Sequence, residues 1–200
     1  METASRILDV AERLVQVRGF NGFSYADIAA ELELTKASLH YHYAGKAELG
    51  HALIDRYAGR FADALAAIDA AGGDAPTKLD AYAAIYADVL SQERMCLCGM
   101  LAAEYETLPA PMREAVTSFF DHNEQWLTTV IEQGRAERSL QLAGSAREAA
   151  QAIVSGLEGA MLVARTYGDV ARFEAATAAL LHGGMAGVSG PSGHRGAQRA

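Results

Sequence analysis

The sequence contains few of the residues on which several common kinds of protein depend. Its 200 residues include two cysteines, four prolines and one tryptophan. Cys96 and Cys98 are separated by one residue, a spacing that builds no disulfide framework and fits no common zinc site. No stretch approaches the roughly 18 uninterrupted apolar residues of a membrane span, and the first residues lack the basic and apolar regions of a secretory signal. We therefore expect a soluble, cytoplasmic protein with reduced thiols.

Negative charge predominates, but it is unevenly distributed. The formal net charge is -8; residues 1–60 carry seven Lys/Arg against eight Asp/Glu, whereas residues 61–200 carry ten against seventeen. Affinity for DNA depends on the local field and on the counterions released, not on the charge of the whole chain. The acidic composition therefore does not exclude a nucleic-acid partner for the N-terminal part.

Apolar residues recur at helical spacing, and no alternating strand pattern competes with them. A first helix is predicted to end at Gly19. Ser24 and Asp27 form a capping-box-like start for a second helix that ends near Leu32, and Thr35 is a good N-cap for a third helix of about two turns. Two short helices joined by a three-residue turn are typical of a helix-turn-helix, here at residues 24–43.

The remaining pattern predicts a longer helical region. Helices are expected at 46–70, 77–92, 97–107, 110–137, 146–167 and 170–183, separated by segments that contain Gly or Pro. From residue 183 onward the chain is rich in Gly, Ser, His and Arg, and we expect disorder there. The predicted class is all-α. We expect a DNA-binding domain at 1–47, a helical domain at 48–184 and a disordered tail at 185–200.

The segment from Gly19 to Tyr43, followed by Lys46 and Leu49, resembles the DNA-binding domain of TetR-family transcriptional regulators. The turn, the caps, the aromatic residues and the following lysine all fall at the separations typical of that family. The resemblance implies a homodimeric regulator, more often a repressor than an activator, that binds double-stranded operator DNA and responds to a small, partly apolar effector. The sequence contains no Gly-x-Ser-x-Gly, P-loop or dinucleotide-binding motif, and we expect no cofactor, no metal and no enzymatic activity. The chain departs from the family at Glu33, Ala37 and His40, where Gly, Gly and Tyr are frequent.

Position along the motif assigns the expected DNA contacts. The N-terminal residues of a recognition helix face base edges in the major groove, while flanking groups hold phosphates. Lys36 is placed to reach guanine and Ala37 a thymine methyl group, and Lys46 is expected to clamp a phosphate. Capping is an alternative role for Ser24 and Thr35, and core packing for Tyr41. The full set is Ser24, Tyr25, Thr35, Lys36, Ala37, Ser38, His40, Tyr41, His42 and Lys46.

The C-terminal helices are expected to hold the effector and to form the dimer through the last two long helices. The apolar faces expected to meet across the dimer carry Ile153, Val154, Leu157, Met161 and Leu162 on one helix and Phe173, Thr177, Leu180 and Leu181 on the other. The candidate effector pocket combines aromatic and sulfur-containing side chains with a few polar tips. Its members are Tyr82, Tyr86, Cys96, Met100, Tyr105, Phe120, His122, Trp126 and Met161.

Three alternatives remain open from the sequence. Cys96 and Cys98 lie near a predicted helix N-terminus, where a lowered thiol pKa would suit a sensor of oxidants or electrophiles. A helical di-metal enzyme would need two Glu-x-x-His motifs, and the chain has one, from Glu48 to His51. A helical protein that has lost DNA binding is disfavoured by the cations at both ends of the predicted recognition helix.

Overall fold

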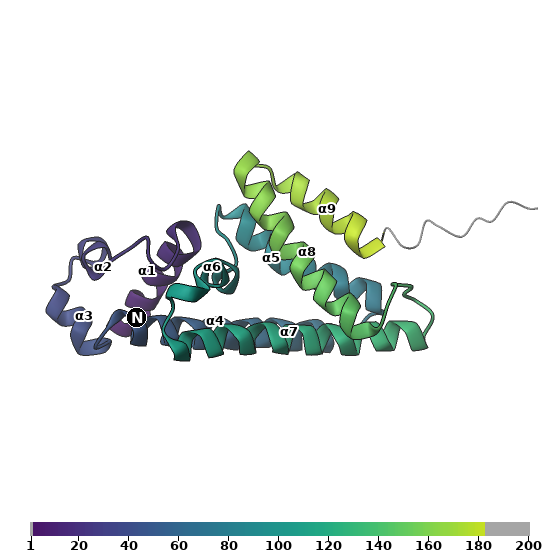
Figure 1. Ribbon diagram of the computed structural model, residues 1–200, viewed down its shortest axis with the longest axis horizontal. Coiled ribbons are helices and arrows are strands. Elements are labelled where there is room, and N and C mark those ends of the chain that lie inside the picture. Colours follow the sequence, from purple (N-terminus) through teal and green to yellow (C-terminus); the bar gives the residue numbers. More distant parts are fainter. Residues whose placement is uncertain (1, 183–200) are drawn as a thin grey trace, which may run out of the picture.

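The computed structural model describes residues 2–182, and within this range the chain is entirely helical (Figure 1). The predicted class is therefore confirmed. The elements are α1 (Thr3–Arg18), α2 (Tyr25–Leu32), α3 (Lys36–His42), α4 (Lys46–Ala71), α5 (Ala75–Ser91), α6 (Leu97–Ala103), the 3-10 turn η1 (Tyr105–Thr107), α7 (Ala110–Ala136), α8 (Ala146–Tyr167) and α9 (Val170–His182). The predicted tail at 185–200 lies outside the described residues. None of the described helices combines the length and the hydropathy needed to cross a membrane.

The helix ends of the N-terminal module follow from local capping. Gly19 ends α1 with φ 84°, in the left-handed region that glycine tolerates. The Asp27 carboxylate accepts hydrogen bonds from the Ser24 amide and hydroxyl at the start of α2. The Thr35 hydroxyl accepts one from the Ser38 amide at 3.1 Å and so caps α3. The predicted helix-turn-helix is present at the expected positions.

Two later elements differ from their predicted bounds for local reasons. Helix α5 begins at Ala75 rather than at residue 77, because Asp74 accepts a hydrogen bond from the Thr77 amide and Pro76 fits the first turn. The helix predicted over 97–107 ends at Ala103, and η1 follows it. Glu104, between them, is not in a helical conformation, and its carboxylate binds the N-terminal module.

The long helices form the frame that carries the small module. Helices α4 and α7 lie side by side along the molecule, with α1–α3 at one end and α5, α8 and α9 towards the other (Figure 1). Their shared core is aromatic: the Phe61 ring lies 5.1 Å from Phe119 and about 6 Å from Tyr82 and Tyr86. Such edge-to-face packing adds to the gain from burial. This core fixes the direction of α4, whose first turn follows α3 directly.

The apolar faces of α8 and α9 that we expected at a dimer interface lie mostly inside one chain. Every expected residue is buried in the core except Leu180, which is partly buried, and Leu162, which is 58% exposed. Gly156 allows this packing, because a Cβ there would come within 2.5 Å of the Leu180 side chain. The assignment of the buried residues was wrong, because helical periodicity identifies an apolar face without showing which helix covers it, whereas Leu162 stays on an exposed face.

The opposite face of the same two helices is the exposed one. On α8 it carries Ala152, Ser155, Gly159, Leu162 and Val163, and on α9 a series of alanines. A Cβ at Gly159 would meet nothing within 4 Å, so this face is open in the single chain. Small side chains allow two helices to approach closely, which makes this face suitable for helix packing.

Candidate nucleic-acid interface and ligand cavities

Helix α3 presents an exposed surface next to the start of α4. Lys36 and Ala37 are exposed and Tyr41 is 86% exposed, while Leu39 is fully buried and anchors the helix. An aromatic side chain left this open is unusual for a folded chain. The alternative of a core Tyr41 is therefore excluded, whereas Tyr43 packs against the core.

The aromatic and imidazole groups behind this surface are held in place by hydrogen bonds. The Tyr25 hydroxyl donates to the Tyr43 carbonyl at 3.0 Å, and its ring lies 4.8 Å from that of His40. Burial raises the pKa of Tyr25 to about 12, so its hydroxyl stays protonated. The His40 Nδ1 lies 3.1 Å from the Ala44 carbonyl, an arrangement that fits a proton on this nitrogen. Tyr25 and His40 thus have fixed positions, as a phosphate contact requires.

Lys46 has a partner that the sequence did not indicate. Its ammonium donates to the carbonyls of Phe20 and Phe23 and lies 4.7 and 4.2 Å from the centres of their rings. Burial lowers its pKa, although Glu104 and Asp27 oppose this effect. The ammonium thus ties α4 to the turn between α1 and α2. The phosphate contact at this position stays a prediction, and the backbone amides of the first turn of α4 are the groups best suited to make it.

The structure places the ten predicted DNA contacts on one continuous part of the module. A shallow depression brings together Ser24, Tyr25, Lys36, His40 and Lys46, with Phe23 and Ala26. Thr35, Ala37, Ser38, Tyr41 and His42 lie on or directly before α3. His42 is half-buried, with its ring 5.3 Å from that of Tyr41.

The residues predicted for an effector pocket do not form one pocket. Met100 and Phe120 line a cavity of about 450 Å³ between α6, α7 and α8, and His122 lines another of about 310 Å³ between α4 and α7. Tyr82, Tyr86, Cys96 and Met161 are buried in the core. Trp126 donates to Asp69 at 2.9 Å, and Tyr105 is 39% exposed. These residues occupy different faces of the helices, and which of them contact an effector stays a prediction.

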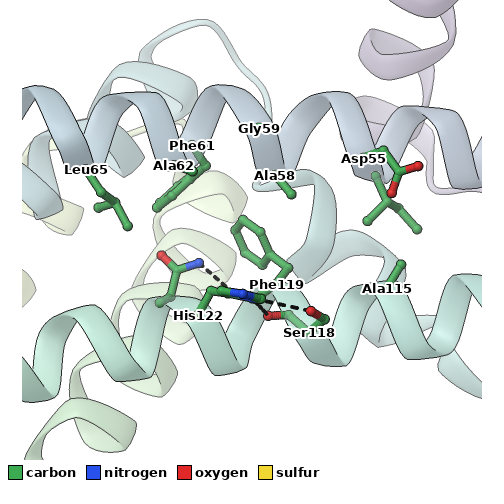
Figure 2. A pocket seen from close by; sticks show the side chains of 12 residues that line it. Asp55, Ala58, Gly59, Phe61, Ala62, Leu65, Ala115, Ser118, Phe119 and His122 are labelled. Carbon is green, nitrogen blue, oxygen red and sulfur yellow. Dashed lines mark hydrogen bonds between the residues drawn. The ribbon is translucent and has the colours of Figure 1, made fainter.

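The cavity between α4 and α7 is mostly apolar (Figure 2). Phe61, Ala62 and Leu65 face it from α4, and Ser118, Phe119 and His122 face it from α7. The His122 Nδ1 lies 2.6 Å from the Ser118 carbonyl, one turn earlier on the same helix. This bond holds the imidazole along α7.

The cavity between α6, α7 and α8 contains the acidic group that the sequence reasoning missed. Its wall includes Glu124 and Glu158 beside Met95, Met100 and Phe120. One signal was available in the sequence: Glu158 follows the core residue Leu157 and lies one turn from Val154 and Met161. An acidic residue at the edge of an apolar helix face is a reason to look for a specific role.

Both cysteines are buried, which favours inert thiols over the sensor alternative. The Tyr57 hydroxyl lies 3.6 Å from the Cys96 sulfur. Burial raises the pKa of both thiols well above its usual value, and the nearby carboxyl of Glu158 raises it further. A neutral, enclosed thiol reacts slowly, so this geometry does not favour an electrophile sensor. Among residues 2–182 no cluster of three His, Cys, Asp or Glu side chains is placed to hold a metal ion.

The comparisons with known sequences agree with this architecture. Residues 7–53 match the family described as bacterial regulatory proteins of the tetR family, and residues 75–180 match the tetracyclin repressor-like C-terminal domain. Together these matches span most of the chain. The protein belongs to the TetR family of bacterial transcriptional regulators.

Particular relatives support the same assignment. A TetR-family regulator from Agrobacterium tumefaciens is 34% identical, with 89% of this chain and 95% of that one covered and a TM-score of 0.86. A TetR regulator from Legionella pneumophila is 33% identical, with coverage of 90% and 96% and a TM-score of 0.82. The HTH-type transcriptional repressor NemR of Escherichia coli is 26% identical over 171 residues, which cover 82% of this chain and 84% of NemR.

Proposed function

We propose that the protein is a homodimeric repressor that binds operator DNA through α3 and releases it when a small effector enters the helical domain. The exposed α3 surface carries this proposal, with Lys36 at its start and an almost fully exposed Tyr41 at its end. The name of the related NemR supports repression over activation. Because the proposed partner is genomic DNA, we place the protein in the cytoplasm and assign it a binding role rather than catalysis.

In this proposal the N-terminal residues of α3 read the bases. Lys36 and Ala37 face the major groove, and Ser38 lies beside them. Thr35 and Ser24 keep their capping bonds and offer hydroxyl oxygens to phosphates, while Tyr25, His40, Tyr41 and His42 contact the backbone. Residues 1–47 then form the DNA-binding domain and residues 48–184 the effector and dimer domain. The start of α4 belongs to both, because Lys46 binds the carbonyls of Phe20 and Phe23.

We assign the dimer to the exposed face of α8 and α9. This face carries small and apolar residues, including Gly159, Leu162 and Val163, and it is open in the single chain. Two copies related by a two-fold axis would pack four helices against each other and bury both faces. The two α3 helices would then face successive major grooves, about one turn of DNA apart.

The cavity beside α6 is the better placed of the two to control DNA binding. It is lined by Gly99, Met100 and Ala103 of α6, and Glu104 directly after this helix binds the backbone of Phe20 and Asn21. On the other wall, α8 carries Arg165, which donates to the Val17 carbonyl at 2.6 Å. A ligand that displaces α6 against α8 would therefore shift the DNA-binding module and change the spacing between the two α3 helices.

The test is binding of the full-length protein to genomic fragments, including its own upstream region, at two salt concentrations. We expect tight, sequence-selective binding that weakens with salt. Lys36→Ala and Tyr41→Ala should each reduce affinity about tenfold or more. Arg147→Ala removes an exposed cation at the start of α8, far from α3, and serves as the control.

The outcomes distinguish a DNA-binding regulator from a protein that has the same fold but does not bind DNA selectively. Selective binding that is lost in Lys36→Ala and Tyr41→Ala but kept in Arg147→Ala supports the proposal. Absence of selective binding at both salt concentrations, or equal losses in all three variants, would show that α3 does not read DNA. Sedimentation of the purified protein as a dimer, and as a monomer after Gly159→Glu, tests the dimer face in the same preparation.

A further inference from the structure

A carboxyl group beside the α6 cavity has one oxygen without a hydrogen-bond partner among residues 2–182. The Oε1 atom of Glu158 is buried and accepts no hydrogen bond from the described residues. The other oxygen lies directly over Gly99, where a Cβ would come within 2.1 Å of it. Both residues line the cavity. The carboxyl group is therefore held at the cavity wall by a close approach that only glycine permits.

Among residues 2–182, no basic side chain neutralises this group. Burial is the largest influence on Glu158 and raises its pKa to about 7, while a hydrogen bond from Cys96 acts in the opposite direction. The titratable groups that face it are thiols and phenols that are neutral at pH 7, namely those of Cys96, Cys98, Tyr57, Tyr82 and Tyr86. A buried carboxylate without a counter-charge is costly, by several kcal/mol in ordinary cases. A bound cation would remove that cost.

The rest of the cavity fits the apolar part of such a ligand. Met95, Met100, Phe120, Val154 and Leu162 supply apolar wall, and the volume of about 450 Å³ is ample for a small organic molecule. No Lys, Arg or His belongs to this lining. The nearby Arg165 is occupied by the Val17 carbonyl and the Met100 sulfur.

Two further features favour a positive charge over a negative one. Glu124 is a second acidic side chain in the wall, held 3.3 Å from the Gln151 amide. Phe120 offers an aromatic ring, which attracts a cation to its face. An anion would meet two carboxyl groups and no basic side chain in this lining. The acidic groups and the apolar wall of this cavity therefore favour a cation with an apolar body.

We propose that the α6 cavity binds an organic monocation, an alkyl or arylalkyl ammonium ion, with Glu158 as its counter-charge. This inference rests on the proposed function, because it assigns the chemical class of the effector. Leu162 lines the cavity and also belongs to the exposed face of α8 that we assign to the dimer, so the partner copy would lie close to the ligand.

The first test compares three probes of one size that differ in charge: hexylammonium, hexan-1-ol and hexanoate. Their affinities for the full-length protein are measured by calorimetry at pH 8. A charge-assisted hydrogen bond predicts that hexylammonium binds about tenfold more tightly than hexan-1-ol, and that hexanoate binds most weakly. Glu158→Gln should abolish the preference, whereas Glu158→Asp should retain part of it. Glu132→Gln, an exposed site on α7, is the matched control.

A second measurement uses the wild-type protein alone and does not depend on how a variant folds. A cation beside Glu158 favours its charged form, so binding at pH 6 should release a proton, and binding at pH 9 should release none. Calorimetry in two buffers of different ionisation enthalpy measures this release. Absence of hexylammonium binding, equal binding of the neutral probe, or a preference that survives Glu158→Gln overturns the proposal.

Operator binding distinguishes this inference from the function on which it rests. If the cation class is right, hexylammonium releases operator DNA from the wild type and from Glu132→Gln, but not from Glu158→Gln. Selective DNA binding that hexylammonium leaves intact sinks the inference and leaves the repressor proposal standing. Cation binding that depends on Glu158, in a protein without selective DNA binding, supports the cavity assignment and contradicts the repressor proposal.

Discussion

The carboxylate of Glu104 accepts a hydrogen bond of 2.5 Å from the backbone amide of Phe20, 84 positions earlier in the chain. The amide of Asn21 lies 3.2 Å from the same carboxylate, and the Asn21 side chain donates to Thr107 at 2.8 Å. A Cβ at Gly19 would come within 2.9 Å of a Glu104 oxygen. The end of α6 and the turn between α1 and α2 are thus joined by a contact that requires Gly19.

Glu104→Ala should loosen this junction. The variant leaves two amides without their charged acceptor, so we expect a loss of about 1–3 kcal/mol in the free energy of unfolding. Hydrogen exchange at Phe20 and Asn21 should accelerate more than exchange in the core of α4. Glu106→Ala, in the exposed η1 turn, is the matched control. Unchanged exchange at the two amides would contradict a role for Glu104 in holding the module.

Glu33 ends α2 in the left-handed region, with φ 56° and ψ 39°. A side chain in this conformation costs about 1 kcal/mol relative to glycine. Glu33→Gly should therefore raise the free energy of unfolding by about 0.5–1 kcal/mol in urea denaturation, with an unchanged dependence on urea concentration. Glu33→Ala removes the same charge but keeps the Cβ, so it should show little of this gain. Equal stabilisation in both variants would assign the effect to charge.

The N-terminal module could be predicted from the sequence because its signals are local. Ser24 and Thr35 cap helices that begin at the next residue, and Gly19 ends the helix directly before it. Such bonds span three or four residues and leave a pattern in the sequence. The departure at Glu33 was also visible in the sequence, because a glycine is frequent at this place in the family, and the backbone there is left-handed.

The cavities and the dimer face could not be predicted in the same way. Met100 and Phe120 share a cavity while Tyr82 and Met161 are buried in the core, and this difference depends on how separate helices rotate against each other. The buried position of Glu158 depends on close contact with Gly99, 59 residues earlier. Periodicity gives the apolar face of each helix, but only tertiary packing decides which neighbour covers it.

Cys96 and Cys98 should react slowly in the native protein. Burial and the neighbouring Glu158 raise the pKa of both thiols, so the reactive thiolate is scarce at pH 7.5. We expect alkylation by iodoacetamide to be at least about a hundredfold slower than in the urea-unfolded chain, measured by mass spectrometry. Cys96→Ser and Cys98→Ser should retain effector-dependent release of DNA. Rapid native alkylation, together with loss of release in either variant, would restore the sensor hypothesis.

The pKa of Glu158 is raised to about 7 from an ordinary value of 4.5. This shift predicts the direction in which the free energy of unfolding changes with pH. Between these values the folded protein binds more protons than the unfolded chain, so its free energy of unfolding falls as pH rises. Glu158→Gln lacks this titration. Its stability relative to the wild type should therefore increase between about pH 4.5 and 7, by on the order of 1–3 kcal/mol, and then level off.

The change with pH, rather than the offset at any one pH, is the diagnostic quantity. Any packing difference caused by Glu158→Gln is present at every pH, and the carboxylates with lowered pKa, such as Asp27 and Asp69, titrate in both proteins and cancel in the difference. Urea denaturation of both proteins and of Glu132→Gln at five pH values measures how the difference in the free energy of unfolding changes with pH. A difference that stays flat across this range would mean that the pKa of Glu158 is not raised in the folded protein, and would contradict the burial of its carboxyl group without a counter-charge.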